Sequence, residues 1–240
     1  MPTTVLLMID LQNSYLVQDV RDALGWPPIW RLDEVVTECR SLLTAARAAA
    51  IPVIYSRQIP SPAGQLAFNP RAGRHRRYRA ERVPKLTPQD KAWRSQLMDA
   101  IAPEPGDLVL EKTRHSFFAY TELNPILRSL GAQRLIVAGL QTNVCVEATV
   151  RAGLEHNFEV AVPEDAVSTD GPALHYAALN SMRVLYVEVA PWRDLIDPDA
   201  KWETAFTTPN YGRDTAYWID PVTTSRVDDS GADLPSGARP

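Results

Sequence analysis

The sequence is poor in cysteine and in long apolar runs, and each shortage excludes a class of protein. Two cysteines in 240 residues rule out a disulfide-rich fold and favour a reducing, cytoplasmic setting. No apolar run approaches the ~20 residues of a membrane-spanning helix, and no basic segment follows Met1 to open a signal peptide. The net charge of -4 lacks the basic excess of nucleic-acid-binding proteins. We therefore expect partners that are neither membranes nor nucleic acids.

The composition is otherwise that of an ordinary globular protein, with 45% hydrophobic and 22% charged residues. Its length corresponds to one domain with appendages. Regular patterning extends over residues 1–190, which we predict to be the folded domain. Residues 191–220 are rich in aromatic side chains without a clear period, and they predict an arm that packs on the body or on another subunit. Residues 221–240 are rich in Ser, Asp, Gly and Pro, and we predict that they are disordered.

Short apolar runs alternate with segments of helical periodicity along the first 190 residues. This alternation predicts an α/β fold with a parallel sheet and helices on both faces, because parallel strands need crossover connections. The predicted strands are residues 5–9, 51–56, 108–110, 134–138, 159–163 and 184–188, and the predicted helices are 33–50, 89–102, 122–130, 172–182 and a helix that begins at 144.

The chain is organised around a thiol at a strand-to-helix hinge. Residues 134–138 predict a buried strand that Gly139 ends, and residues 141–143 are of turn and N-cap types. Cys145 then falls in the first turn of the next helix. Because the N–H groups and dipole at a helix start favour an anion, we expect this position to favour the thiolate. Cys39 lies on the apolar face of its helix and is interpreted as a buried packing residue.

Two further ionisable residues follow other predicted strands: Asp10 after the first and Lys112 after the third. Ligands of open α/β sheets bind at the carboxyl edge of the strands, so both could meet Cys145 there. A carboxylate can accept the thiol proton, and a lysine can hold the carboxylate ionised and stabilise the thiolate. Taken singly, Asp10 could equally be a cap and Lys112 a solvated surface charge.

Residues 6–13, 111–118 and 137–149 resemble, in this order, the opening, lysine and nucleophile motifs of the isochorismatase-like cysteine hydrolases. The resemblance covers about residues 4–190. It implies a three-layer fold with a six-stranded parallel sheet and a catalytic triad of Asp10, Lys112 and Cys145. It also implies a cis peptide between Leu140 and Gln141, and an oxyanion hole formed by the N–H groups of Gln141 and Cys145.

The branches of this family differ at positions that the sequence shows. Members that hydrolyse the vinyl ether of isochorismate lack the nucleophilic cysteine, which is present here as Cys145. Nicotinamidases carry an Asp-x-His metal motif after the second strand, and residues 56–59 do not contain it. The resemblance therefore favours the carbamoylsarcosine, ureidoacrylate and biuret amidohydrolases, with no metal or other cofactor. The alternatives are isochorismate-type hydrolysis and a non-catalytic binding protein on the same fold.

The resulting hypothesis is hydrolysis of a small amide, ureido or carbamoyl compound through a thioester on Cys145, with Asp10 as the proton carrier. The specific substrate is left open. Tyr15, Arg114 and Phe118 flank the motifs and are candidate substrate-binding residues, although aromatic residues there could also be core. An arginine-rich run at 71–82 is interpreted as a solvated or interface surface, or as a clamp for a substrate carboxylate.

A cysteine–histidine dyad is the rival to this triad. Of the four histidines, His115 is the one that the pattern puts near the site, three residues after Lys112. No pair of histidines has the spacing of metal ligands. The family and the aromatic arm together predict a homo-oligomer, a dimer or a tetramer.

Overall fold

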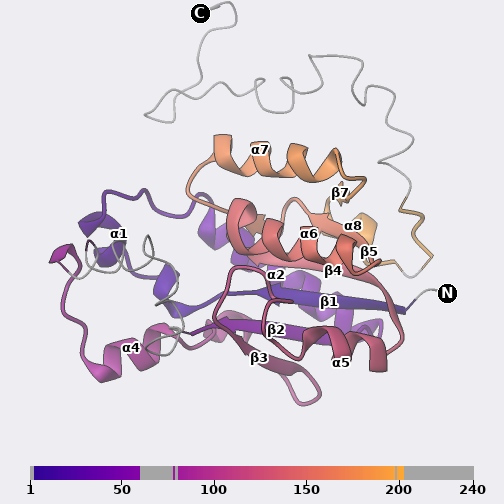
Figure 1. Ribbon diagram of the computed structural model, residues 1–240, viewed down its shortest axis with the longest axis horizontal. Coiled ribbons are helices and arrows are strands. Elements are labelled where there is room, and N and C mark those ends of the chain that lie inside the picture. Colours follow the sequence, from indigo (N-terminus) through magenta and orange to yellow (C-terminus); the bar gives the residue numbers. More distant parts are fainter. Residues whose placement is uncertain (1–2, 60–77, 79–80, 198, 203–240) are drawn as a thin grey trace, which may run out of the picture.

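The computed structural model describes residues 3–59, 78, 81–197 and 199–202 (Figure 1). Its centre is a seven-stranded sheet in the order β3-β2-β1-β4-β5-β7, with β6 paired beside the end of β4. The described strand pairs run parallel. The strands are β1 (Thr3–Ile9), β2 (Val53–Gln58), β3 (Leu108–Lys112), β4 (Ala132–Leu140), β5 (Glu159–Pro163), β6 (Val167–Ser168) and β7 (Glu188–Ala190).

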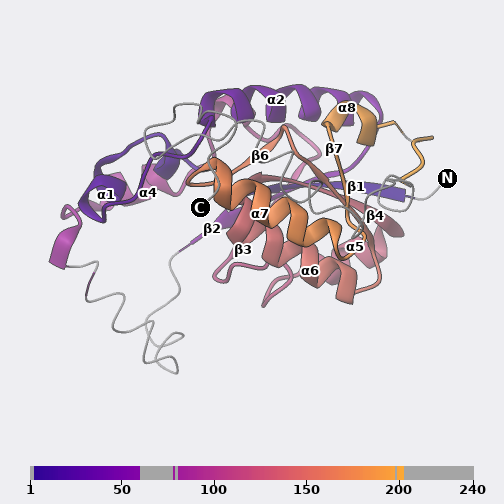
Figure 2. The ribbon, with the colours of Figure 1, turned by 90° about the horizontal axis from the view of Figure 1, so that it is seen from above.

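Helices cover both faces of this sheet, as Figure 2 shows: α2 and α8 lie on one side, and α5, α6 and α7 lie on the other. Because the connections are helical crossovers, the parallel three-layer fold predicted from the alternating pattern is confirmed. The helices are α1 (Asp19–Ala23), α2 (Leu32–Ala48), α4 (Pro88–Arg94), α5 (Leu123–Ser129), α6 (Glu147–Glu155), α7 (Pro172–Arg183) and α8 (Trp192–Leu195), with short helices η1 (Asn13–Tyr15), η2 (Asp99–Ile101) and η3 (Thr142–Val146).

Strand β1 is apolar on both faces because it is covered on both faces. Its residues alternate between two cores: Leu6 and Met8 join the cluster under α2 and α8, whereas Leu7 and Ile9 join the cluster under α5, α6 and α7. All four side chains are fully buried. Each fully buried aliphatic side chain of this kind contributes about 1.5–3 kcal/mol, and this anchors the strand that carries Asp10 at its end.

The sheet differs from the predicted strands at three places. The sixth predicted strand, 184–188, is wrong: α7 continues to Arg183, a turn follows with Tyr186 at a φ of 62°, and β7 spans Glu188–Ala190. The two-residue β6 was not predicted. Strand β4 does not end at Gly139 but runs through it to Leu140. Gly139 has a φ of +112°, and a Cβ there would lie 2.3 Å from the Ile9 oxygen, so β1 and β4 approach too closely for a side chain.

The helices differ from the prediction at two places. The helix predicted over 89–102 ends at Arg94, and η2 follows before residue 102. The segment after Asp10, for which no helix was predicted, contains η1 and α1. Among the described residues, none of the helices is long and apolar enough to cross a membrane.

The predicted aromatic arm is described only as far as residue 202. Its first part packs on the body: the buried Trp192 donates from Nε1 to Glu38 at 2.7 Å, and the Arg134 guanidinium lies 4.7 Å from the Trp202 ring centre. The rest of the arm and the tail predicted to be disordered lie outside the described residues, as does most of the arginine-rich run. Within that run, Arg82 is exposed and lies over the Tyr78 ring.

Candidate active site

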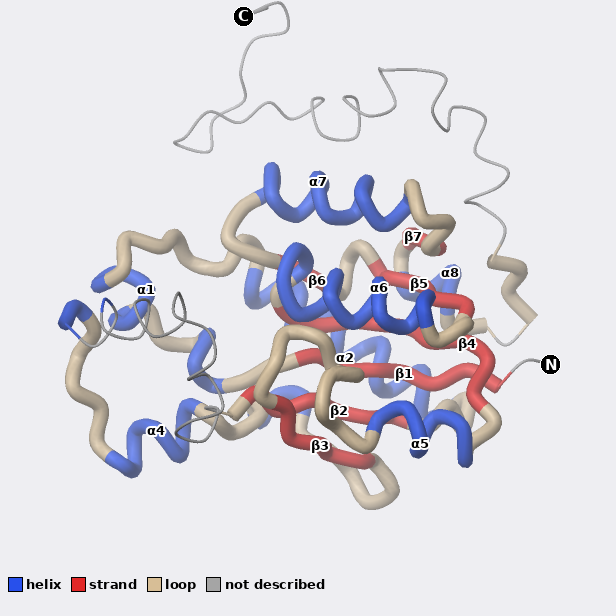
Figure 3. The backbone as a smooth tube through the Cα atoms, viewed as in Figure 1, coloured by secondary structure: helices blue, strands red, loops and turns tan. Residues whose placement is uncertain are grey.

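The carboxyl ends of the central strands bring the predicted residues together. The loops that follow β1, β3 and β4 lie on the same side of the sheet, away from the N-terminus (Figure 3). The register explains this: Ile9, just before Asp10, pairs with Ser56 of β2 and with Gly139 of β4. Lys112 pairs with Gln58 at the end of β2. Asp10 and Lys112 therefore approach each other across β2.

Asp10 and Lys112 form a buried ion pair. Lys112 Nζ lies 2.6 Å from Asp10 Oδ2, and the two residues are 1% and 2% exposed. The other carboxylate oxygen, Oδ1, accepts a 2.6 Å hydrogen bond from the Ser56 hydroxyl, which in turn accepts one from the Asp10 N–H. Asp10 has a φ of 48°, an uncommon value for a residue with a side chain. The turn that this conformation makes aims the carboxylate at the edge of the sheet.

The Lys112 ammonium is held by two more oxygen atoms. It donates to Gln58 Oε1 at 2.7 Å and to the Arg114 carbonyl at 2.9 Å. Gln58 is in turn fixed by Gln12, whose side chain accepts from the Gln58 N–H and donates to the Gln58 carbonyl. These oxygen partners offset the cost of burying the ammonium and hold it in place.

Cys145 lies in η3, the π-helical turn between β4 and α6. Its carbonyl accepts a 2.7 Å hydrogen bond from the Thr149 hydroxyl, and that hydroxyl accepts from the Phe117 N–H. The turn that carries Cys145 is thereby tied to the loop that follows β3. Cys145 is 7% exposed, so the thiol is nearly enclosed by the protein.

The expectation that the hinge favours a thiolate is wrong for this structure. The pKa of the Cys145 thiol is raised to about 12, mainly by burial and in part by the negative charge of Asp10, while Lys112 opposes both. The loss of water around the sulfur destabilises the thiolate more than the helix dipole stabilises it, because the dipole contributes only about 0.3–1 kcal/mol. The resting site therefore holds a protonated thiol beside a carboxylate.

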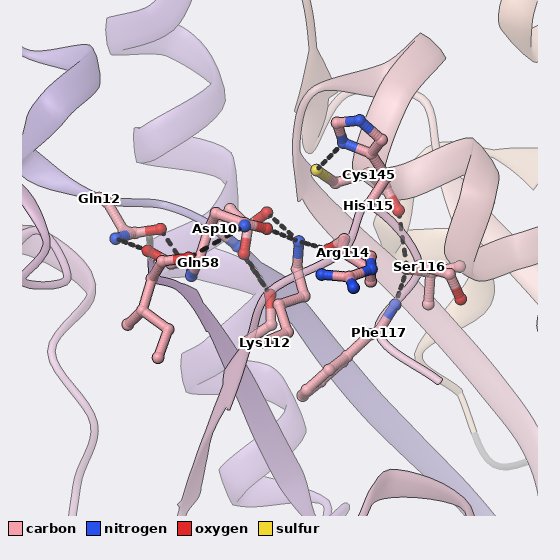
Figure 4. Close-up of polar contacts among 12 residues, drawn as sticks. Asp10, Gln12, Gln58, Lys112, Arg114, His115, Ser116, Phe117 and Cys145 are labelled. Atoms are coloured by element: carbon pink, nitrogen blue, oxygen red, sulfur yellow. Dashed lines mark hydrogen bonds and ion pairs between the residues drawn. The ribbon is translucent and has the colours of Figure 1, made fainter. Parts of the chain in front are cut away.

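His115 lies on the far side of the sulfur from Asp10, as Figure 4 shows. Its Nδ1 is 3.8 Å from Cys145 Sγ. Burial lowers the pKa of His115, the Lys112 charge lowers it further, and Asp10 partly opposes this shift. The histidine that the sequence put near the site thus contacts the thiol, and it is neutral at pH 7.

Comparison with known proteins identifies the family. The model of the isochorismatase domain matches residues 4–194. The chain belongs to the isochorismatase family. The resemblance that the three motifs indicated is thereby confirmed.

Relatives of this isochorismatase-family chain include named enzymes and solved structures. The ureidoacrylate amidohydrolase RutB of Methylobacterium radiotolerans is 33% identical over 198 residues, which are 77% of this chain and 74% of that protein. RutB of Pantoea ananatis is 35% identical over 177 residues, 70% of each chain. The crystal structure of an isochorismatase family protein from Desulfovibrio vulgaris superposes with a TM-score of 0.67 at 26% identity, covering 84% of this chain and all of that one.

The Leu140–Gln141 peptide of this family member is cis, as the resemblance implied. Beyond that bond, the Gln141 side chain donates to Asp170, and Asp170 also pairs with the buried Arg21. Arg21 reaches across from α1 and donates to the Pro27 carbonyl at 2.7 Å. These contacts hold the turn before Cys145 against the segment that follows β1.

The three candidate substrate-binding residues lie in different surroundings. Tyr15 is partly buried, and its pKa is raised by burial and further by the negative charge of Asp10, so the two residues lie within electrostatic range of each other. The Arg114 guanidinium turns back to Thr113 and lies 5.2 Å from the Tyr120 ring centre. Phe118 is 9% exposed and belongs to the core cluster under α5, α6 and α7. Of the three candidates, Tyr15 is therefore the one that we keep as a neighbour of Asp10.

Sequence reasoning missed several residues that hold the site. Ser56 and Gln58 were considered only as positions without a metal motif. Both lie near the carboxyl end of β2, where the expectation that ligands bind at strand ends, which found Lys112, also applies. Gln12 and Asp170 carried no signal, because their roles depend on partners 46 and 29 residues away along the chain. Among the described residues, no cluster of three or more His, Cys, Asp or Glu side chains is arranged to hold a metal ion.

Proposed function

We propose that this isochorismatase-family chain is a cysteine-dependent amidohydrolase that cleaves a C–N bond of a small amide, ureido or carbamoyl compound. Two observations support this. Its relatives of about a third identity are named ureidoacrylate amidohydrolases. The chain also has a thiol, Cys145, at the sheet edge where Asp10 and Lys112 form their ion pair.

The position of Asp10 Oδ2 carries the proposal. This oxygen is buried, and apart from the Lys112 ion pair it has no hydrogen-bond partner among the described residues. It is therefore the free acceptor for the thiol proton. The charges of Asp10 and Lys112 both act on the pKa of Cys145, which supports a position of both groups beside the sulfur. The thiol can be deprotonated as it attacks, so no stable thiolate is needed beforehand.

The first half of the reaction forms an acyl-enzyme. Asp10 takes the Cys145 proton while sulfur bonds to the substrate carbonyl carbon. The resulting oxyanion accepts hydrogen bonds from the N–H groups of Gln141 and Cys145. Collapse of this intermediate breaks the C–N bond, and Asp10 returns the proton to the leaving nitrogen. Ammonia or an amine departs, and the acyl group remains on Cys145 as a thioester that water then hydrolyses.

Tyr15 is the substrate contact that we retain. It lies within electrostatic range of Asp10 and also borders a hollow whose other walls include Gln18, Pro28 and Arg31. The body of a small substrate would lie between this hollow and the sulfur. Arg114 contributes through its carbonyl, which orients Lys112, rather than through its guanidinium. Phe118 supports the core, and we leave it out of the binding site.

Replacing the nucleophile tests this function. Ammonia release from ureido acids, carbamoyl compounds and primary amides is measured for the wild type, Cys145→Ala and Cys39→Ala. Cys39 is the matched control because it is also a buried thiol, bonded to the Ala166 carbonyl and remote from the site. We expect turnover to be lost only in Cys145→Ala, with unchanged thermal unfolding. Equal activity of Cys145→Ala and the wild type would refute a cysteine mechanism.

The alternatives make different predictions in the same assay. An isochorismate-type hydrolase would release no ammonia but would cleave a vinyl ether independently of Cys145. A binding protein would turn over neither class. Assembly into a dimer or tetramer and a cytoplasmic setting remain predictions from the sequence.

A further inference from the structure

We propose that the His115 imidazole is a second proton-transfer group of this site and activates the water that hydrolyses the acyl-enzyme. The inference deepens the proposed amidohydrolase function and rests on it. It divides the two half-reactions between two bases: Asp10 serves acylation, and His115 serves deacylation.

The geometry separates the two groups by their access to water. His115 is exposed to solvent, and its Nδ1 lies 3.8 Å from Cys145 Sγ. Asp10 is 2% exposed and lies on the interior side of the sulfur. Once an acyl group occupies Sγ, water reaches the thioester carbonyl from the open side. The exposed imidazole lies beside the sulfur, opposite Asp10 (Figure 4), so we place the incoming water next to it.

The contacts of Asp10 and His115 support the same division of roles. Asp10 Oδ1 accepts from Ser56 at 2.6 Å, and Oδ2 is 2.6 Å from Lys112 Nζ. Oδ1 is thus occupied, and Oδ2, although free to accept the thiol proton, is buried beside Lys112. The described contact of the His115 ring is the sulfur itself, so the imidazole can turn a nitrogen to a water molecule beside the acyl carbon.

The charge state of His115 suits a base. The groups that face it are Lys112, Asp10 and Cys145, and Cys145 is a neutral thiol at pH 7. Burial and the Lys112 charge keep the pKa of His115 below its ordinary value, with Asp10 opposing. A neutral imidazole can accept a proton, whereas a protonated one could not.

The deacylation step balances without any added reagent. His115 takes one proton from water as the water oxygen bonds to the thioester carbonyl carbon. The tetrahedral intermediate collapses, the C–S bond breaks, and the electron pair stays on sulfur. The imidazolium then gives its proton to the adjacent thiolate. This regenerates the Cys145 thiol and neutral His115, and it releases a carboxylic or carbamic acid.

The test is His115→Gln, in which the side chain still forms hydrogen bonds but cannot carry a proton. With an amide substrate of the wild type, we expect one equivalent of ammonia per site at near wild-type rate, followed by turnover that is about 10²–10⁴-fold slower. Intact-protein mass spectrometry should show the acyl adduct on Cys145. In the wild type the deacylation rate falls at acidic pH as the imidazole is protonated, and His115→Gln should lose this dependence.

The controls distinguish a structural effect from proton transfer. His156→Gln is the matched control, because His156 lies past the end of α6 and stacks on Phe118 away from the sulfur. It should turn over like the wild type. His115→Ala should recover part of its rate when free imidazole is added.

Two results would overturn the assignment of His115. Steady turnover of His115→Gln at the wild-type rate without an adduct would mean that Asp10 serves both steps. A slow ammonia burst would place His115 before acylation. Failure of the proposed function looks different: the wild type itself would then release no ammonia and form no adduct.

Discussion

The buried Asp10–Lys112 pair gives the sharpest prediction about how the site and the fold depend on each other. The perturbations are Asp10→Asn, which keeps the shape of the side chain, and Lys112→Met, which keeps most of its length. Each removes one charge and leaves the other buried without its partner. Both residues are at most 2% exposed, so solvent cannot replace the lost partner.

The expected magnitude follows from this burial. Removing one partner of a buried ion pair costs about 3–5 kcal/mol of unfolding free energy. For a chain of this size, that corresponds to a fall in Tm of about 6–20 °C. The double variant Asp10→Asn/Lys112→Met removes both charges together. It should cost no more than one single change, because its remaining losses are the Lys112 hydrogen bonds to Gln58 and Arg114.

Urea unfolding of the four proteins measures this coupling as a double-mutant cycle. We expect a coupling free energy of about 3–5 kcal/mol between the two positions. Single-variant effects that add to within about 0.5 kcal/mol would refute the reasoning. The double variant also separates stability from chemistry, because it should regain stability while ammonia release stays absent.

Two further predictions concern pH. Because burial raises the pKa of Cys145 to about 12, iodoacetamide at pH 8 should alkylate it more than about a hundredfold more slowly than an exposed thiol. Asp10→Asn should speed this alkylation while abolishing turnover, and slower alkylation would contradict the assigned charge effect. Burial also lowers the pKa of His175 to about 4, so the unfolded chain binds a proton more readily than the folded protein. Unfolding free energy should therefore fall by about 3 kcal/mol between pH 6.5 and pH 4, and urea titrations of His175→Gln should show a flatter profile.

Local pattern accounts for most of what could be predicted about the fold. Residues 5–9 and 160–163 are apolar because both faces of their strands are covered, and both strands are found. The last strand was misplaced because residues 184–187 form a turn: Leu185 and Val187 pack on the core cluster under α5, α6 and α7, whereas Val184 and Tyr186 are exposed. Apolar runs alone do not separate a buried turn from a buried strand.

In the site, too, local sequence pattern predicted some residues, whereas the roles of others depend on contacts between distant parts of the chain. Asp10, Lys112 and Cys145 could be found because each lies at or shortly after the carboxyl end of a strand, and parallel strands end at one edge. The roles of Ser56 and Gln58 in holding Asp10 and Lys112 depend on the register between neighbouring strands, which no local pattern specifies. The placement of His115 against the sulfur depends on how the loop after β3 is tied to α6 through Thr149.

The sequence by itself determined the fold class, the family and the three ionisable groups at the sheet edge, because periodicity and motif order are properties of contiguous residues. The tertiary structure alone decided the protonation of the Cys145 thiol. A thiol at a helix start favours the thiolate only while water surrounds it. Cys145 is instead enclosed by the protein and lies beside Asp10, and both effects raise its pKa. Burial depends on everything that packs around a residue, and that is settled only when the whole chain has folded.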